Sequence, residues 1–144
     1  ANMAGVDAMA ADEGLIFNQA DAPHANTRDA HRLLHLALAE GGTAAQAALN
    51  ERLLHNYFVD AKNPADRDLL RTSAIEAGLN LARVEAVLTS DEFDDAVAAD
   101  VAQARAYGAT GVPFFVVDQR YGIAGAQPTE AFSRTLEAAW NDRD

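Results

Sequence analysis

Thr110–Gln127 reads T-G-V-P-F-F-V-V-D-Q-R-Y-G-I-A-G-A-Q, and this stretch decides the fold. Phe114–Val117 is a continuous apolar run of aromatic and β-branched residues, which predicts a strand that is buried on both faces. A short polar break follows, and Tyr121–Ala124 then predicts a second, weaker strand that completes a hairpin. Gly125 closes the hairpin, and a last helix is expected to begin near Pro128.

Pro113 stands directly before the first predicted strand. A proline at this position cannot donate to the strand ladder, and it restrains Val112 to an extended conformation. Gly111 allows a backbone shape that other residues resist. An arbitrary X-Pro bond in a folded protein is cis only about 5–6% of the time, so these residues alone give no reason to expect a cis bond.

The remainder of the chain predicts helices, because apolar residues recur at helical spacing. The expected helices cover residues 1–12, 28–40, 43–58, 64–77, 81–88 and 91–107, with a final one from residue 128. Thr27, Thr43 and Asn80 are predicted N-caps, and Pro64 is expected in a first helical turn. Gly41-Gly42 is expected to end one helix before the next begins.

Two apolar stripes are expected to face a core. In the helix over 91–107 the stripe includes Val97, Val101 and Ala104. In the last helix it includes Phe132, Leu136, Ala139 and Trp140. The chain is 49% hydrophobic but rich in alanine, which favours a core of close-packed helices.

Three segments resemble one known family: Ala109–Val116, Tyr121–Pro128 and Asn26–Ala37. They are similar to the DsbA-like thiol–disulfide oxidoreductases of the FrnE-like branch. The resemblance implies an α/β fold of the thioredoxin-like, DsbA type, here mainly the helical insertion plus the C-terminal β-hairpin and helix. It divides the chain into a helical insertion module, residues 1–107, and a β–β–α part, residues 108–144.

The resemblance also implies a function. The chain would be part of a protein thiol–disulfide oxidoreductase, supplying the cis-proline loop and a substrate-facing helical module. Thr110, Gly111, Val112 and Pro113 are the implied substrate-binding residues, with Pro113 as the cis-proline and the backbone of Val112 paired to an extended substrate segment. From the spacing alone, a loop proline that merely starts a strand fits equally well.

The chain contains no cysteine, although enzymes of this kind act through a thiolate. The resemblance therefore implies no catalytic residue in this chain and leaves open whether the chain is an enzyme. The Cys-x-x-Cys segment would belong to another part of a longer protein. Two alternatives remain: a glutathione-using isomerase or transferase of the same fold, which uses a serine, and a non-catalytic binding or assembly module.

Net charge and composition limit the classes of binding partner that are expected. The formal net charge is −11, which disfavours nucleic acid and anionic membranes, since phosphate binding needs clustered Lys and Arg. No apolar run approaches the roughly 20 residues of a membrane span, and no secretory signal is visible. The resemblance implies a cytoplasmic protein, no cofactor, and a protein or small-thiol substrate. A lone hairpin leaves sheet edges unpaired, so a missing N-terminal segment or a second copy of the chain is the other expected partner.

His31 and His35 are four residues apart on a predicted helix, a spacing that can hold a metal if a third ligand is present. Only His24 and Asp29 are nearby candidates, and no metal is expected. His55 is expected on the surface. The acidic cluster predicts a solvated helix face, with Asp100 closest to the apolar stripe; its members are Asp91, Glu92, Asp94, Asp95 and Asp100.

Overall fold

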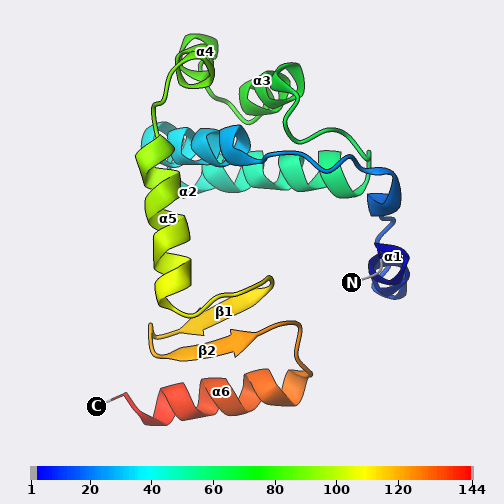
Figure 1. The fold of residues 1–144 in the computed structure, drawn as a ribbon, viewed down its shortest axis with the longest axis vertical. Coiled ribbons are helices and arrows are strands. Elements are labelled where there is room, and N and C mark those ends of the chain that lie inside the picture. The colour runs from blue at the N-terminus through cyan, green and yellow to red at the C-terminus, as the bar shows by residue number, and fades with distance from the viewer. Residues whose placement is uncertain (1–2, 144) are drawn as a thin grey trace. The chain divides into compact units, whose positions relative to one another are not determined.

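The computed structural model describes residues 3–143, which form two compact units (Figure 1). Ala1–Val97 is called the helical unit, and Ala98–Asp144 the hairpin unit. The elements, in order, are α1 (Met3–Asp12), a 3-10 turn η1 (Gln19–Asp21), α2 (Arg28–Phe58), α3 (Arg67–Glu76), α4 (Leu81–Thr89), α5 (Asp94–Ala106), β1 (Phe114–Val117), β2 (Tyr121–Ala124) and α6 (Thr129–Asn141). Ala1 and Asn2, where the first helix was expected to start, lie outside the described residues.

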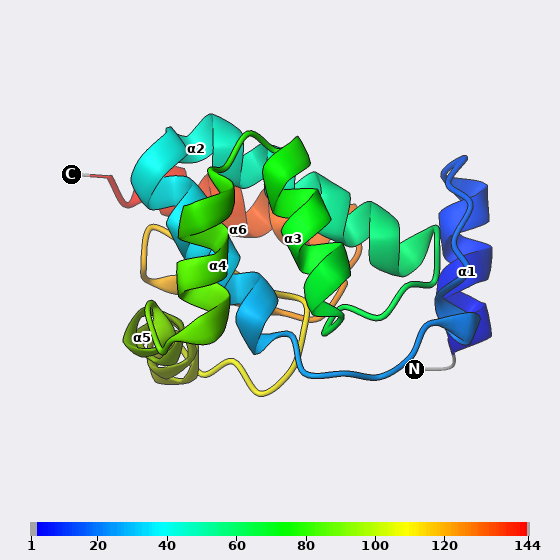
Figure 2. The ribbon, with the colours of Figure 1, turned by 90° about the horizontal axis from the view of Figure 1, so that it is seen from above.

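Helix α2 is the long central element of the helical unit. Gly42 interrupts it with φ +70° and ψ −169°, so the helix bends into two arms (Figures 1 and 2). A left-handed φ of this kind suits glycine, which has no Cβ to clash. The break expected at Gly41-Gly42 is therefore a kink inside α2, and no loop separates the two arms.

The helix starts follow from side chains that accept the first free N–H groups. Asn80 caps α4 as predicted, with its Oδ1 accepting from the N–H of Ala82 at 2.9 Å and of Arg83 at 3.3 Å. Thr27 makes no such bond; instead Asn26 Oδ1 accepts from the N–H of Arg28 at 2.8 Å. Thr27 therefore stands at the predicted N-cap position, but the side chain of its neighbour Asn26 satisfies the first free N–H group of α2.

Helix α3 begins later than the sequence suggested. Asp66 is its N-cap, and its Oδ1 accepts from the N–H of Asp68 at 2.9 Å and of Leu69 at 3.2 Å. Pro64 instead lies in the preceding turn, which Asn63 closes by accepting from the N–H of Asp66 at 3.1 Å. The placement of Pro64 in the first turn is wrong, because the carboxylate of Asp66 offers the stronger start signal.

The core of the helical unit joins α2, α3 and α4. Leu36, Leu49, Leu70 and Val87 are fully buried there. The cluster consists of Ala30, Leu33, Leu36, Ala37, Leu49, Leu70, Ala74, Leu79, Val84, Val87 and Leu88. The expectation of a core made of close-packed helices is met in this unit.

One charged side chain is buried beside this core. Arg32 is only 4% exposed. Its guanidinium donates to the carbonyls of Val87, Ser90 and Glu92 at 2.5, 2.6 and 2.8 Å, and to Asp29 Oδ1 at 2.9 Å. Arg32 therefore binds carbonyls at and beyond the end of α4, where the helix supplies few N–H donors.

Ion pairs surround the same end of α4. Arg83 donates to Glu92 at 2.6 Å, and this hydrogen bond lowers the pKa of the Glu92 carboxyl. Arg28 donates to Asp94 at 2.8 Å and lowers the pKa of that carboxyl. Part of the acidic cluster is thus paired with arginines.

The hairpin unit has α6 on one face of its two strands. The antiparallel register pairs Phe115 with Ile123 and Val117 with Tyr121, and both strands have the bounds that the sequence predicted. Ile123 is 6% exposed, and the ring of Phe115 meets Phe132 edge-on at 5.0 Å. Side chains alternate between faces along a strand, so Phe115 and Ile123 share the α6 face.

The burial predicted for β1 is wrong in this structure, and the two helical stripes are buried only in part: Val97 and Ala139 are 7% and 4% exposed. Phe115 and Val116 are 42% and 37% exposed, and Trp140 is 69% exposed. Leu136 and Val101 are also exposed. Spacing identified the apolar stripes, but a stripe is buried only where another element lies against it. Of the helices in the described part of the chain, none is both long and apolar enough to cross a bilayer.

Candidate functional site: the loop before β1

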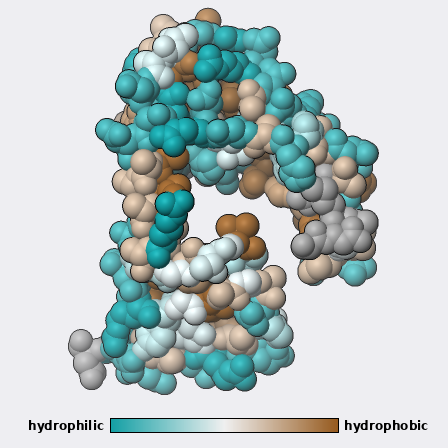
Figure 3. All heavy atoms as spheres, in the orientation of Figure 1, coloured by the Kyte–Doolittle hydropathy of each residue, from teal (hydrophilic) through white to brown (hydrophobic). Residues whose placement is uncertain are grey.

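The loop from Ala109 to Pro113 connects α5 to β1. Gly108 ends α5 with φ +87°, and the N–H of Ala109 donates to the carbonyl of Ala104 at 3.0 Å. The Val112–Pro113 peptide bond is cis. Val112 is 95% exposed, and the space-filling view shows a strongly hydrophobic patch at this loop beside residues of intermediate hydropathy (Figure 3).

The loop is anchored at its two ends, at Ala109 and at Pro113. The carbonyl of Pro113 accepts a hydrogen bond from the N–H of Gly125 at 2.8 Å, which extends the β1–β2 ladder by one step. In the described part of the chain, no backbone hydrogen bond involves the N–H or C=O of Val112. The loop therefore presents one residue's backbone groups beside a fixed strand.

The opposite end of the hairpin is closed by an unusual turn. Asp118 and Gln119 both have left-handed backbones, with φ of 50° and 57°. The hydroxyl of Tyr121 donates to a carboxylate oxygen of Asp142, and this bond raises the pKa of the Tyr121 phenol. These contacts tie the hairpin to the end of α6 and leave the loop before β1 exposed.

A groove of about 350 Å³ adjoins the loop within the hairpin unit. Phe114 and Val116 line it from the strand face opposite Phe115. Helix α5 and the connecting loop supply the other walls, through Asp100, Gln103, Ala104, Tyr107, Ala109, Gly111 and Val112. The groove walls are mostly apolar, which suits an apolar side chain next to an extended backbone.

Gly122 leaves room for the ring of Phe114 on this face of the hairpin. A Cβ placed on Gly122 would come 3.1 Å from Cζ of Phe114. The ring of Phe114 therefore lies over the backbone of β2, where a larger residue would push it toward the groove.

The structure places the four predicted substrate-binding residues together. Thr110, Gly111, Val112 and Pro113 are consecutive and exposed, and Gly111 and Val112 also line the groove. The groove residues of α5 were not predicted as site residues. Their spacing of three and four is visible in the sequence, but the same spacing is typical of core packing, which is the prediction made for Ala104.

The histidines do not form a metal centre. Within residues 3–143, no group of three or more His, Asp or Glu side chains is arranged to hold a metal ion. His35 stacks on Phe93 at 6.1 Å, while His31 is exposed and lines a different cavity. His55 lies on the surface with its side chain 56% exposed.

Comparisons with known proteins agree on one family. A family model described as a DSBA-like thioredoxin domain matches residues 2–137. A solved structure of a probable DsbA oxidoreductase from Streptomyces coelicolor is similar, with a TM-score of 0.83 and 40% sequence identity. The match covers 97% of this chain and 59% of that one, so this chain spans about three fifths of the solved protein. A search of curated proteins gave no match.

Proposed function

Because the chain belongs to the DSBA-like thioredoxin family, we propose that it is the substrate-binding part of a protein thiol–disulfide oxidoreductase. The cysteine pair would come from a part of the polypeptide outside these 144 residues. In the exchange, a thiolate attacks a disulfide sulfur, one S–S bond breaks as a mixed disulfide forms, and a second thiolate then releases the product. Residues 110–113 would hold the substrate segment during these steps.

The observation that carries this proposal is the exposure of Val112 together with its unpaired backbone groups. Val112 is 95% exposed, and its backbone N–H and C=O have no partner among the described backbone hydrogen bonds. An exposed backbone beside a strand is the arrangement used when a peptide adds to a sheet edge. The substrate would therefore be an extended segment on either side of its reacting cysteine.

Removing the Val112 N–H should weaken the binding of protein substrates and leave small disulfides little affected. We expect Val112→Pro, in the intact polypeptide, to lower kcat/KM for a disulfide-bonded protein about tenfold, the value of one lost hydrogen bond. Exchange with a small disulfide such as oxidised glutathione should change little, because a small disulfide needs no backbone pairing. Steady-state kinetics with both substrates measures the difference.

The matched control is Val112→Ala, which keeps the N–H and shortens an exposed side chain. It should leave both rates close to those of the unaltered protein. Unfolding midpoints of both variants check that the hairpin still forms. Equal kinetics for the proline and alanine variants would show that the backbone of Val112 does not bind substrate.

We also propose that a further segment covers the open hairpin. Each strand has one unpaired edge in the described residues, and Phe115 and Val116 are more than a third exposed. Unpaired edges and exposed apolar side chains favour association. Light scattering should find residues 1–144 alone as dimers or larger species at micromolar concentration, and the intact polypeptide as a smaller assembly. A stable monomer of residues 1–144 would contradict this.

The intact polypeptide also separates the alternative functions. A Cys-x-x-Cys pair and exchange activity would support the oxidoreductase. A serine in its place together with glutathione binding would favour an isomerase or transferase of the same fold. No exchange and no glutathione binding would favour a non-catalytic module. The FrnE-like branch and a cytoplasmic location rest on the resemblance alone, and fractionation of the source cells tests the second.

A further inference from the structure

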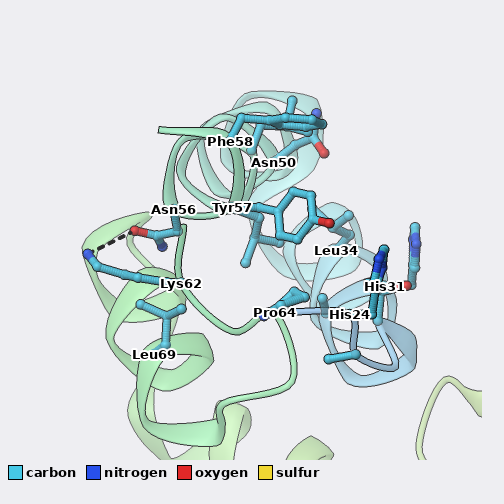
Figure 4. Close-up of a pocket in the computed structure, with 15 residues that line it drawn as sticks. His24, His31, Leu34, Asn50, Asn56, Tyr57, Phe58, Lys62, Pro64 and Leu69 are labelled. Atoms are coloured by element: carbon cyan, nitrogen blue, oxygen red, sulfur yellow. Dashed lines mark hydrogen bonds between the residues drawn. The ribbon is translucent and has the colours of Figure 1, made fainter. Parts of the chain in front are cut away.

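A second cavity lies inside the helical unit and has a different character from the groove beside β1. It encloses about 210 Å³ (Figure 4). Its walls come from both arms of α2, from the segments before and after α2, and from α3 through Leu69. The apolar wall residues are Ala25, Ala30, Leu34, Leu53, Leu54, Phe58, Pro64 and Leu69.

The volume sets the size of ligand that fits. An apolar protein cavity of about 150 Å³ binds benzene. The cavity in the helical unit therefore has room for one ring with a small polar group attached. It is too small for the drug-sized ligands that occupy pockets of roughly 300–1,000 Å³.

Two imidazoles and a phenol lie on one side of the cavity. In Figure 4 the hydroxyl of Tyr57 points toward the side where His24 and His31 lie. All three residues line the cavity, although they come from the segment before α2 and from its two opposite arms. Lys62 lies at the other end, where its Nζ donates to Asp60 at 2.7 Å and contacts Asn56 at 3.4 Å.

The charge of the lining is unlike that of the whole chain. The protein has 22 Asp and Glu against 11 Lys and Arg, yet none of the described residues that line this cavity is Asp or Glu. Lys62 already has a carboxylate partner, which leaves the imidazoles and the phenol for a ligand. Donors without a neighbouring acid favour an anion.

We propose that this cavity binds a small apolar monocarboxylate. The apolar body, about the size of one ring, lies between Leu34, Leu53 and Pro64. The carboxylate accepts hydrogen bonds from the hydroxyl of Tyr57 and the imidazoles of His24 and His31. This site lies within the helical unit, and its occupation does not depend on thiol–disulfide chemistry.

The test is a titration of the intact polypeptide with benzoate, with benzamide as a neutral ligand of the same shape. Amide chemical shifts followed by NMR should give a dissociation constant for benzoate of about 1 mM or lower, and much weaker binding of benzamide. His31→Leu should raise the dissociation constant for benzoate about tenfold, because a hydrogen bond to a charged group is lost. Benzamide binding should change far less.

Two further variants make the result specific. His55→Leu removes another exposed histidine of α2 that does not line this cavity, so benzoate binding should be unchanged. Leu54→Trp should fill the cavity from its rim and abolish binding of both ligands, while circular dichroism confirms that the helices persist. Equal affinity for benzoate and benzamide, no shifts at 10 mM benzoate, or equal effects of the two histidine variants would overturn the proposal.

Discussion

Replacing Leu36 with alanine is expected to lower the free energy of unfolding of the helical unit by about 3–5 kcal/mol. Leu36 is fully buried in the cluster that joins α2, α3 and α4. The shorter side chain loses its transfer free energy and leaves a cavity, because neighbours held in three helices cannot close fully around it. Urea unfolding followed by circular dichroism at 222 nm measures the loss as a lower midpoint.

Leu38 provides the matched control for Leu36. It lies on the same arm of α2 but is 41% exposed. Leu38→Ala should therefore cost less than about 1 kcal/mol. A similar loss in the two variants would mean that the cluster is not the core of this unit.

Arg32→Met is expected to lower the free energy of unfolding by about 3 kcal/mol, although methionine is also unbranched and has no charge to bury. Arg32 donates to the carbonyls of Val87, Ser90 and Glu92 and to the carboxylate of Asp29. Methionine donates to none of them, so the part-buried carbonyls of Ser90 and Glu92 lose this donor and Asp29 loses its closest arginine. The midpoint of urea unfolding should fall while its slope stays constant.

Arg52 is the control for this second prediction, because it has one exposed partner. Arg52 pairs with Glu76, and both side chains are about half exposed. Arg52→Met should change stability by less than about 1 kcal/mol. Arg32→Lys should fall between the two methionine variants, since an ammonium keeps the charge but cannot reach all the carbonyls. If Arg32→Met lowered the free energy of unfolding as little as Arg52→Met, the carbonyls would be hydrogen-bonded to water in the absence of Arg32.

The sequence predicted the elements whose signals are local. The bounds of β1 and β2 follow from an apolar run between Pro113 and a polar turn. The kink in α2 follows from Gly42, because glycine accepts a left-handed backbone. The start of α4 follows from Asn80, whose side chain reaches N–H groups two and three residues later. Each of these signals acts within a few residues of its source.

Features that depend on distant residues were not predicted. The acceptors of Arg32 lie 55 to 60 residues along the chain, so no local pattern shows why an arginine is buried. The same is true of Trp140 and Val116, whose apolar character is visible but whose exposure depends on what packs against them. His31 was considered with His35 because of their spacing, whereas the fold brings it near Tyr57 of the other arm.

The cis bond before β1 could not be predicted from the neighbouring residues, for a different reason. The residues around Pro113 gave no reason to expect it, and the expectation came only from the resemblance. The groove next to this loop was missed for a related reason. Ala104 and Tyr107 have the spacing of a buried helix face, and only the course of the chain through Gly108 shows that this face borders the strand.

The order of the chain gives the buried cluster a consequence for synthesis on the ribosome. All of its members lie between Ala30 and Leu88, so every side chain that the helical core requires has been made before translation reaches β1. Domains generally fold as units, the N-terminal one first. The helical unit can therefore bury its leucines while the hairpin is still being translated, which shortens the time that these side chains are exposed to aggregation in the cell.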